Sequence, residues 1–284
     1  MRWEDERRSD NVEDRRGLPI PGGIAGGGIG LVVIVVLALI FGVDPRALLQ
    51  NLPSQSSTPA PASQSAQSGQ ADPMKDFVAA VLGSTEDTWG EVFQRSGMTY
   101  EPPRLVLFSG AVQSACGYAQ AAVGPFYCPS DRKVYIDLSF YRELKERFQA
   151  PGEFAQAYVI AHEVGHHVQN LLGISDKVHA AQARGSQANA NALSVRMELQ
   201  ADCLAGVWAA NANRERHILE RGDMEAGLNA ASQIGDDRMQ MRARGYVSPE
   251  SFTHGSSQQR VRWFKRGLET GSVKECDTFK TAQL

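Results

Sequence analysis

The segment AYVIAHEVGHHVQNLLG, from Ala157 to Gly173, constrains the fold of this 284-residue chain most strongly. Its apolar residues recur with the period of a helix that is buried along one face. His162 and His166 are four residues apart, so both imidazoles lie on one face of that helix and can reach a single metal ion. Glu163 is rotated by about 100° around the helix axis and lies beside such an ion, where a general base is needed. We therefore predict a metal-binding H-E-x-x-H helix rather than a core helix with satisfied histidines.

A catalytic zinc ion needs a third protein ligand and an open coordination position. The extended motif H-E-x-x-H-x-x-G-x-x-H is excluded, because Gln169 and Leu172 occupy the positions of its glycine and its third histidine. The segment from Asn191 to Ala210 has a helical apolar stripe and carries Glu198 and Asp202 four residues apart on one adjoining face. An unpaired carboxylate on such a helix is costly. A metal ion and a ligating histidine would relieve that cost.

The two motifs together resemble those of the thermolysin-like gluzincins, in which H-E-x-x-H is followed by E-x-x-x-D on a second helix. HEVGHHVQN, ELQADCLAG and FTHGSSQQRVRWFKRG, placed behind one membrane span, resemble the bacterial neutral zinc metallopeptidase family. The resemblance implies one catalytic Zn²⁺ ligated by His162, His166 and Glu198, with Glu163 as the general base. It also implies that Asp202 accepts a hydrogen bond from a ligating histidine. The implied fold is an α+β, zincin-like metallopeptidase domain, mostly helical with a small sheet and preceded by one transmembrane helix.

The chemistry expected of such a site is hydrolysis of a protein or peptide substrate by a zinc-activated water, with Glu163 as the base. His254 and Tyr246, in one C-terminal loop, are candidates for stabilising the oxyanion. One alternative is a zinc-containing envelope domain that binds proteins or peptides with little or no catalysis, although a structural zinc has no need of Glu163. Another is a zinc hydrolase of a different class that takes Cys116 or Cys128 as a ligand.

The remaining features of the histidine-rich helix have structural interpretations. His167 points about 100° away from His166, so we interpret it as structural. His179 and His217 have no motif around them, and we expect both at the surface. Gly165 costs about 1 kcal/mol relative to alanine inside a helix. We therefore expect another element, a strand or the second motif helix, to approach the backbone closely at that position.

Residues 22–43 are predicted to form a transmembrane helix. The stretch Ile24 to Val43 carries no charge, and 20 helical residues span about 30 Å, the thickness of the hydrocarbon core. A cleaved signal peptide is less favoured, because the preceding polar segment is long and no clear cleavage site follows. Five arginines precede the span and one follows it before Lys75, which predicts a cytoplasmic N-terminal arm over residues 1–21. The expected location is the bacterial inner membrane, in a single pass, with the catalytic domain in the periplasm or otherwise outside the cytoplasm.

The chain beyond the span divides into a tether and a domain. Residues 44–72 are rich in Ser, Gln, Ala and Pro and are predicted to be a flexible tether. Residues 73–284 form the predicted extracytoplasmic domain. It is expected to begin with a helix over residues 74–97, continue with a strand over residues 104–110 and a hairpin over residues 124–140, and then be mostly helical.

The cysteines and the charge narrow the choice of function further. The four cysteines form no C-x-x-C pair, which argues against zinc ribbons and thioredoxin-type sites. Cys116 and Cys128 flank one strand-rich segment, so we pair them and leave Cys203 with Cys276. The net charge of −3 gives no sign of a nucleic-acid partner. The basic run from Arg260 to Gly267 is interpreted as the solvated face of an amphipathic helix, and the oligomeric state is not predicted.

Overall fold

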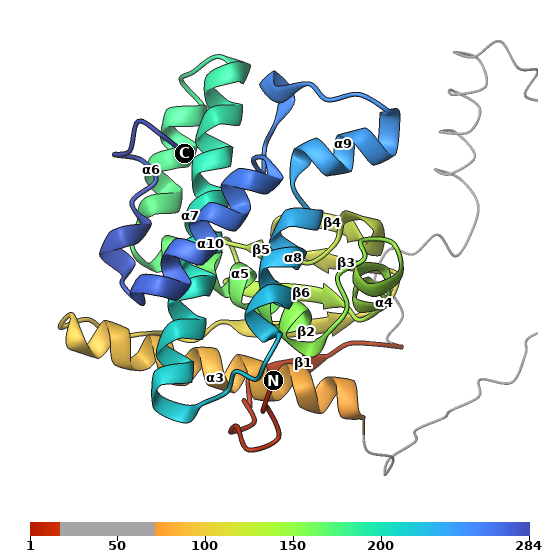
Figure 1. The fold of residues 1–284 in the computed structure, drawn as a ribbon, viewed down its shortest axis with the longest axis vertical. Coiled ribbons are helices and arrows are strands. Elements are labelled where there is room, and N and C mark those ends of the chain that lie inside the picture. Colours follow the sequence, from red (N-terminus) through yellow and green to blue (C-terminus); the bar gives the residue numbers. More distant parts are fainter. Residues whose placement is uncertain (18–71) are drawn as a thin grey trace, which may run out of the picture. The chain divides into compact units, whose positions relative to one another are not determined.

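The computed structural model describes residues 1–17 and 72–284. These residues form a mixed α+β structure, mostly helical with a small sheet, as predicted (Figure 1). The strands are β1 (Val12–Asp14), β2 (Arg104–Phe108), β3 (Ala111–Ser114), β4 (Gly117–Gln120), β5 (Phe126–Cys128) and β6 (Lys133–Asp137). The α-helices are α3 (Pro73–Arg95), α4 (Ser139–Glu146), α5 (Glu153–Leu171), α6 (Ile174–Gln182), α7 (Gln187–Arg216), α8 (Asp223–Gln233), α9 (Asp236–Arg244) and α10 (Ser257–Thr270).

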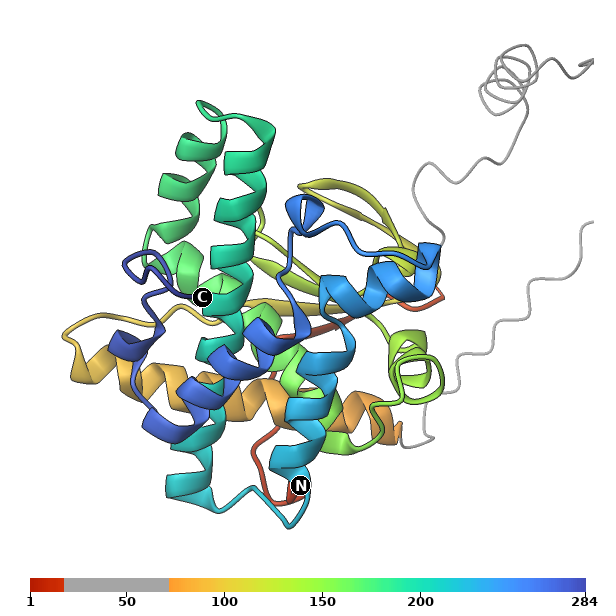
Figure 2. The same cartoon turned by 45° about the horizontal axis from the view of Figure 1, so that its top comes forward.

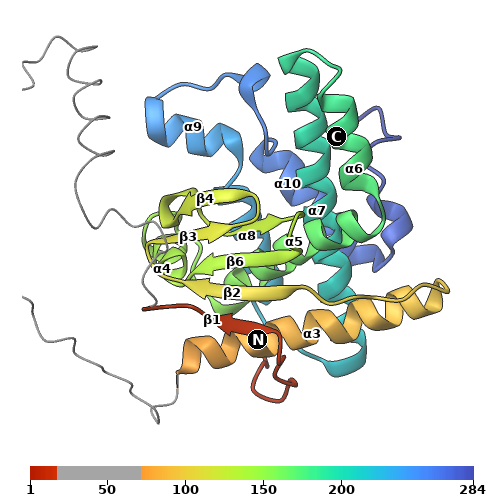
Figure 3. The ribbon, with the colours of Figure 1, turned by 180° about the vertical axis from the view of Figure 1, so that it is seen from behind.

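The main sheet has the strand order β1-β2-β6-β5, in which β5 is antiparallel to its neighbour and the other pairs are parallel. Side chains of β2 alternate between two cores. Leu105 and Leu107 join the large cluster that contains the helices, whereas Val106 and Phe108 join a smaller cluster with Val112 of β3. Both faces of β2 are thus covered, which explains the unbroken apolar run LVLF that follows the exposed Arg104. Figure 3 shows β3 and β4 beside this sheet and α3 along its β1 side.

Several predictions of local structure are confirmed. Helix α3 occupies nearly all of the predicted helical segment, and its N-cap Asp72 accepts hydrogen bonds from the backbone N–H groups of Met74 and Lys75. The predicted hairpin is formed by β5 and β6, with Cys128 opposite Lys133. The structure contains the two predicted disulfides, Cys116–Cys128 and Cys203–Cys276.

Residues 1–17 are an integral part of the folded unit that contains residues 72–284. Strand β1 pairs with β2, so that Val12 lies opposite Leu105. The backbone of the N-terminal segment also lies directly on α3. A Cβ atom added to Gly83 would be 2.3 Å from the carbonyl oxygen of Arg7, and this close approach accounts for a glycine in the middle of that helix. The N-terminal residues therefore complete the sheet and cover part of α3.

This packing changes the predicted domain boundaries. Residues 1–17 and 72–284 must lie on the same side of any membrane, because β1 is hydrogen-bonded to β2. The predicted arm over residues 1–21, separated from the domain by one crossing, does not hold for residues 1–17. The predicted span over residues 22–43 and the predicted tether over residues 44–72 lie outside the described residues, except for Asp72, which is the N-cap of α3. Among residues 1–17 and 72–284, no helix is long and apolar enough to cross a bilayer.

Three helices position the histidine-rich segment. Helix α7 packs against both α5 and α10, and Figure 2 shows α6 and α7 standing side by side as a helical hairpin. A Cβ atom on Gly165 would be 2.9 Å from the carbonyl oxygen of Ala201. The element that packs closely against Gly165 is therefore α7, the second motif helix. On the other side of α7, a Cβ atom on Gly267 of α10 would be 1.9 Å from the carbonyl oxygen of Cys203, so the three helices are in close backbone contact.

Candidate metal centre

The structure brings His162, His166 and Glu198 together at the contact between α5 and α7. Their candidate ligand atoms all lie within 4.8 Å of one another. His162 Nε2 is 3.2 Å from Glu198 Oε2, and His166 Nε2 is 3.4 Å from Glu198 Oε1. The two histidines are one helical turn apart on α5, and the close approach of α7 at Gly165 brings the glutamate to the same point. Spacing places each pair of residues on one face of its helix, and the family resemblance implies that His162, His166 and Glu198 form one ligand set.

Asp202 lies immediately behind His162, the place that the family resemblance implies for it. Its side chain is fully buried, and Oδ1 is 2.8 Å from His162 Nδ1. The hydroxyl of Tyr158 donates a hydrogen bond of 2.5 Å to the same oxygen. Burial alone would raise the pKa of Asp202, but the charges and hydrogen bonds of Arg260 and His162 together outweigh burial and lower the pKa to about 2. A carboxylate held in this state accepts the Nδ1–H of His162 and leaves Nε2 directed at Glu198.

Arg260 of α10 is a residue of the site that sequence reasoning missed. Only 3% of its side chain is exposed, and its Nε and Nη2 atoms each donate a 2.8 Å hydrogen bond to the carboxylate of Asp202. The interpretation of its helix as solvated is therefore wrong for Arg260. The available signal was helical spacing, since Arg260 lies three and four residues before Trp263 and Phe264, both of which are buried.

Glu163 lines a cavity of about 560 Å³ that opens beside the histidines. The cavity wall includes Phe126 and Tyr127 of the edge strand β5, and Met197 and Glu198 of α7. Glu163 is 8% exposed. Burial raises the pKa of its carboxyl group above the ordinary value, and this effect exceeds the opposing attraction of the two histidines. The side chain is therefore placed to exchange a proton with a molecule in the cavity.

The two loop residues predicted as oxyanion donors have different environments. His254 lines the cavity, and its Nδ1 lies 3.2 Å from Oδ1 of Asp236. The hydrogen bond with Asp236 raises the pKa of His254. Asp236 also accepts the backbone N–H of His254, which fixes the loop. Tyr246 does not line the cavity formed by the described residues. Its ring is 57% exposed and packs against the guanidinium group of Arg244.

The other histidines are structural or superficial. His167 is fully buried, its Nε2 donates to the carbonyl oxygen of Glu101, and the hydroxyl of Tyr127 therefore donates to its Nδ1. Burial lowers the pKa of His167 to about 4, so the ring is neutral. His167 thereby ties α5 to the edge strand of the cavity. His179 and His217 are exposed as predicted, and His179 lies on the rim of the cavity.

The donor set fits a divalent metal ion. Ligand atoms about 2.0–2.1 Å from a tetrahedral zinc ion are about 3.3 Å apart, close to the two nitrogen–oxygen distances here. Three carboxylates, those of Glu163, Glu198 and Asp202, face the single guanidinium group of Arg260. With neutral histidines the cluster carries two excess negative charges, which a divalent cation would balance. All four cysteines are in disulfides, so a thiolate ligand from Cys116 or Cys128 is excluded.

These features define a mixed α+β protein whose two central helices form a candidate His₂Glu metal centre beside an open cavity. The chain belongs to the family described as "Putative neutral zinc metallopeptidase", whose model matches residues 1–279. The match therefore includes the N-terminal residues as well as the segment with the motifs. Membership implies a zinc ion and a protein or peptide substrate.

Two relatives illustrate the extent of the similarity. The chain is 49% identical over 294 residues to "Uncharacterized protein YpfJ" of Escherichia coli (strain K12), which covers 98% of this chain and 99% of that protein. It is 40% identical over 258 residues to "Uncharacterized protein Rv2575" of Mycobacterium tuberculosis (strain ATCC 25618 / H37Rv), which covers 87% of this chain and 86% of that protein. No solved structure matches the chain.

Proposed function

We propose that this protein is a zinc-dependent endopeptidase with a zincin-like, gluzincin-type site. The observation that carries the proposal is the convergence of His162, His166 and Glu198 next to Glu163 in one cavity. A structural metal site is normally closed by four protein ligands, whereas a catalytic one keeps an open position. Three ligands and an adjacent buried carboxylate match the catalytic pattern. Zinc in this centre supplies Lewis-acid activation of water and of the scissile carbonyl group.

The side chains of the protein perform the proton transfers. Glu163 accepts a proton from the attacking water and passes it to the amine that leaves. Asp202 and Arg260 hold His162 with Nε2 directed at the metal position. The Asp236 carboxylate orients His254, whose other ring nitrogen is then available to stabilise negative charge on the carbonyl oxygen.

The direct test compares the full-length chain with the Glu163→Gln variant, using a diverse peptide library and mass spectrometry. The full chain is required, because a protein that begins at Pro73 lacks β1. We expect both proteins to bind one zinc ion and only the wild type to cleave peptides. Cleavage by both proteins would refute Glu163 as the base. Absence of cleavage by both, with zinc bound, would instead favour an envelope domain that binds proteins or peptides.

We also propose that the folded unit formed by residues 1–17 and 72–284 lies outside the cytoplasm. Two disulfides and no free cysteine support an oxidising compartment. Residues 1–17 would then share that compartment with residues 72–284. The exposed residue Asp10 offers a test. An impermeant thiol reagent should label an Asp10→Cys variant in spheroplasts without lysis, and labelling only after lysis would refute this location.

A further inference from the structure

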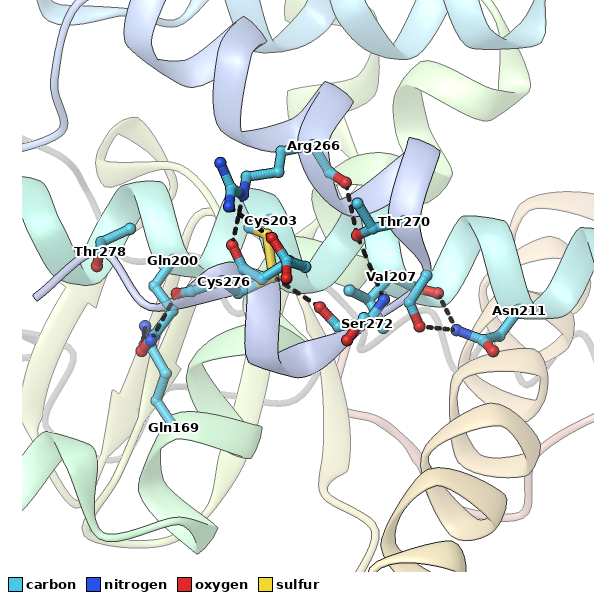
Figure 4. Close-up of a disulfide and its surroundings, with 12 residues drawn as sticks. Gln169, Gln200, Cys203, Val207, Asn211, Arg266, Thr270, Ser272, Cys276 and Thr278 are labelled. Carbon is cyan, nitrogen blue, oxygen red and sulfur yellow. Dashed lines mark hydrogen bonds and ion pairs between the residues drawn. A yellow bond between two sulfur atoms is a disulfide. The ribbon is translucent and has the colours of Figure 1, made fainter. Parts of the chain in front are cut away.

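A chain of buried amide groups leads from His166 to the C-terminal part of the protein. Oε1 of Gln169 is 2.9 Å from His166 Nδ1. Nε2 of Gln169 donates to the carbonyl oxygen of Met197 at 2.7 Å and to Oε1 of Gln200 at 3.1 Å. Nε2 of Gln200 in turn donates to the carbonyl oxygen of Cys276 at 2.9 Å. Figure 4 shows Gln169, Gln200 and Cys276 in this arrangement.

The direction of every hydrogen bond in this series of amides is fixed by the backbone carbonyl groups of Met197 and Cys276. Backbone carbonyl groups only accept hydrogen bonds, so the Gln200 amide must turn its NH₂ group towards Cys276 and its oxygen towards Gln169. The NH₂ group of Gln169 then faces Gln200 and Met197, and its oxygen faces His166. An oxygen acceptor at this position requires a proton on His166 Nδ1. The chain therefore leaves the lone pair of His166 Nε2 free on the side of Glu198.

The Cys276 end of this series of hydrogen bonds is held by a disulfide. Cys276 is 1% exposed and forms its disulfide with Cys203, which lies three residues after Gln200 on α7. The hydroxyl of Thr278 also donates a 2.7 Å hydrogen bond to the carbonyl oxygen of Arg196 on the same helix. The Cys276 carbonyl is thus fixed relative to the helix that carries Gln200. Gln169 is fully buried and Gln200 is 6% exposed, so water does not replace these bonds readily.

We infer that Gln169 and Gln200 are positioning residues that select the metal-binding nitrogen of His166, and that the Cys203–Cys276 disulfide anchors them. The inference rests on the metal centre of the proposed function. On this inference the two histidines are oriented by different groups, His162 by the charged carboxylate of Asp202 and His166 by neutral amides. It also assigns a role in the site to a disulfide that contributes no ligand.

The test replaces Gln200 with methionine, which has a similar volume and no hydrogen-bonding group at its end. The matched control is Asn211→Leu on the same helix. Asn211 is 3% exposed, and its amide donates to the carbonyl oxygens of Val207 and Gly271, so it also joins α7 to the C-terminal part of the chain. Its amide does not contact His166, and its loss should reduce stability without changing the metal centre.

Two measurements on the full-length protein decide the outcome. Zinc affinity, measured by competition with a chelator, should fall by about 10- to 100-fold in Gln200→Met and stay at the wild-type value in Asn211→Leu. In zinc-loaded protein, ¹H–¹⁵N NMR should show a slowly exchanging Nδ1–H of His166 that is lost or broadened only in Gln200→Met. Unchanged zinc affinity in Gln200→Met, or an equal loss in the control, would overturn the inference. A wild type that binds no zinc would refute the metal centre itself, and this inference with it.

The disulfide provides a second comparison. Replacing Cys203 and Cys276 by serine should weaken zinc binding in the same way, because the Cys276 carbonyl is released. Replacing Cys116 and Cys128 by serine removes the other disulfide and should leave zinc affinity unchanged. If both pairs of substitutions weaken zinc binding equally, the Cys203–Cys276 disulfide has no specific role in orienting His166.

Discussion

Replacing Arg260 with methionine tests whether the buried ion pair between Arg260 and Asp202, behind His162, stabilises the folded protein. Methionine fills the space of the arginine stem but removes the two 2.8 Å hydrogen bonds to Asp202. Asp202 is fully buried, so no solvent can replace the lost charge. Its carboxylate would keep the hydrogen bonds from Tyr158 and His162.

Removing one partner of a buried ion pair costs about 3–5 kcal/mol of unfolding free energy. We expect a value near 3 kcal/mol, because Tyr158 and His162 still donate to the carboxylate of Asp202. For a unit of this size, each kcal/mol lowers the melting temperature by about 2–4 °C. The Arg260→Met variant should therefore melt about 6–12 °C below the wild type.

Urea and thermal unfolding of the full-length chain in the presence of EDTA measure this cost without a contribution from metal binding. Arg262→Met is the control, because Arg262 is exposed on the same helix and donates to the carbonyl oxygen of Leu284. Its effect should stay within about 0.5 kcal/mol. If Arg260→Met unfolds at the same urea concentration as this control, the ion pair does not stabilise the fold and our reasoning about Asp202 is wrong.

Three further predictions concern other parts of the molecule. Gly165→Ala places a Cβ atom 2.9 Å from the carbonyl oxygen of Ala201. It should lower the free energy of unfolding by about 1–3 kcal/mol and weaken zinc binding. A variant with wild-type stability and zinc affinity would contradict the close contact of α5 and α7. Burial opposes the ionisation of Glu13, but hydrogen bonds from Lys133 and two arginines lower its pKa to about 2. This stabilisation is complete above the ordinary pKa of 4.5 and is lost as the pH falls towards 2. Glu13→Gln should therefore destabilise the fold by about 2 kcal/mol at pH 7, and a loss that does not shrink in acid, as followed by urea unfolding, would argue against this role. Burial alone would lower the pKa of His162, but the charge of Asp202 and the hydrogen bonds with Asp202 and Glu198 together raise it to about 10. Zinc must therefore displace a proton, and its affinity should rise up to about tenfold per pH unit between pH 6 and 8. Chelator competition that shows no pH dependence would exclude this coupling.

The sequence was most informative where residue spacing on one helix decides the geometry. His162 and His166 could be placed on a common face from the helical period alone, and Glu198 and Asp202 from the same argument on a second helix. The predicted close contact at Gly165 follows from the conformational cost of glycine in a helix. Each of these features depends on local rules that a single sequence contains.

Features that depend on long-range packing could not be derived in this way. Arg260 is 58 residues from Asp202, and a charged residue in a basic run is usually solvated. The predicted cytoplasmic arm over residues 1–21 rests on the predicted span that follows it and on its five arginines. The contribution of residues 1–17 depends on the pairing of Val12–Asp14 with β2, which lies about ninety residues further along the chain. Nothing in the local pattern VED indicates that partner.

The position of β1 at the end of the sheet has a consequence for aggregation. Without residues 1–17, the strand RLVLF would present a row of unpaired N–H and C=O groups along an apolar edge, which is the usual template for association between chains. Glu13, which binds Lys133 and Arg104, places a charged cluster at the edge that β1 covers. During synthesis β1 emerges first, but it cannot pair until β2 has followed. The N-terminal strand therefore acts as a cap that keeps the folded sheet from adding strands from neighbouring molecules.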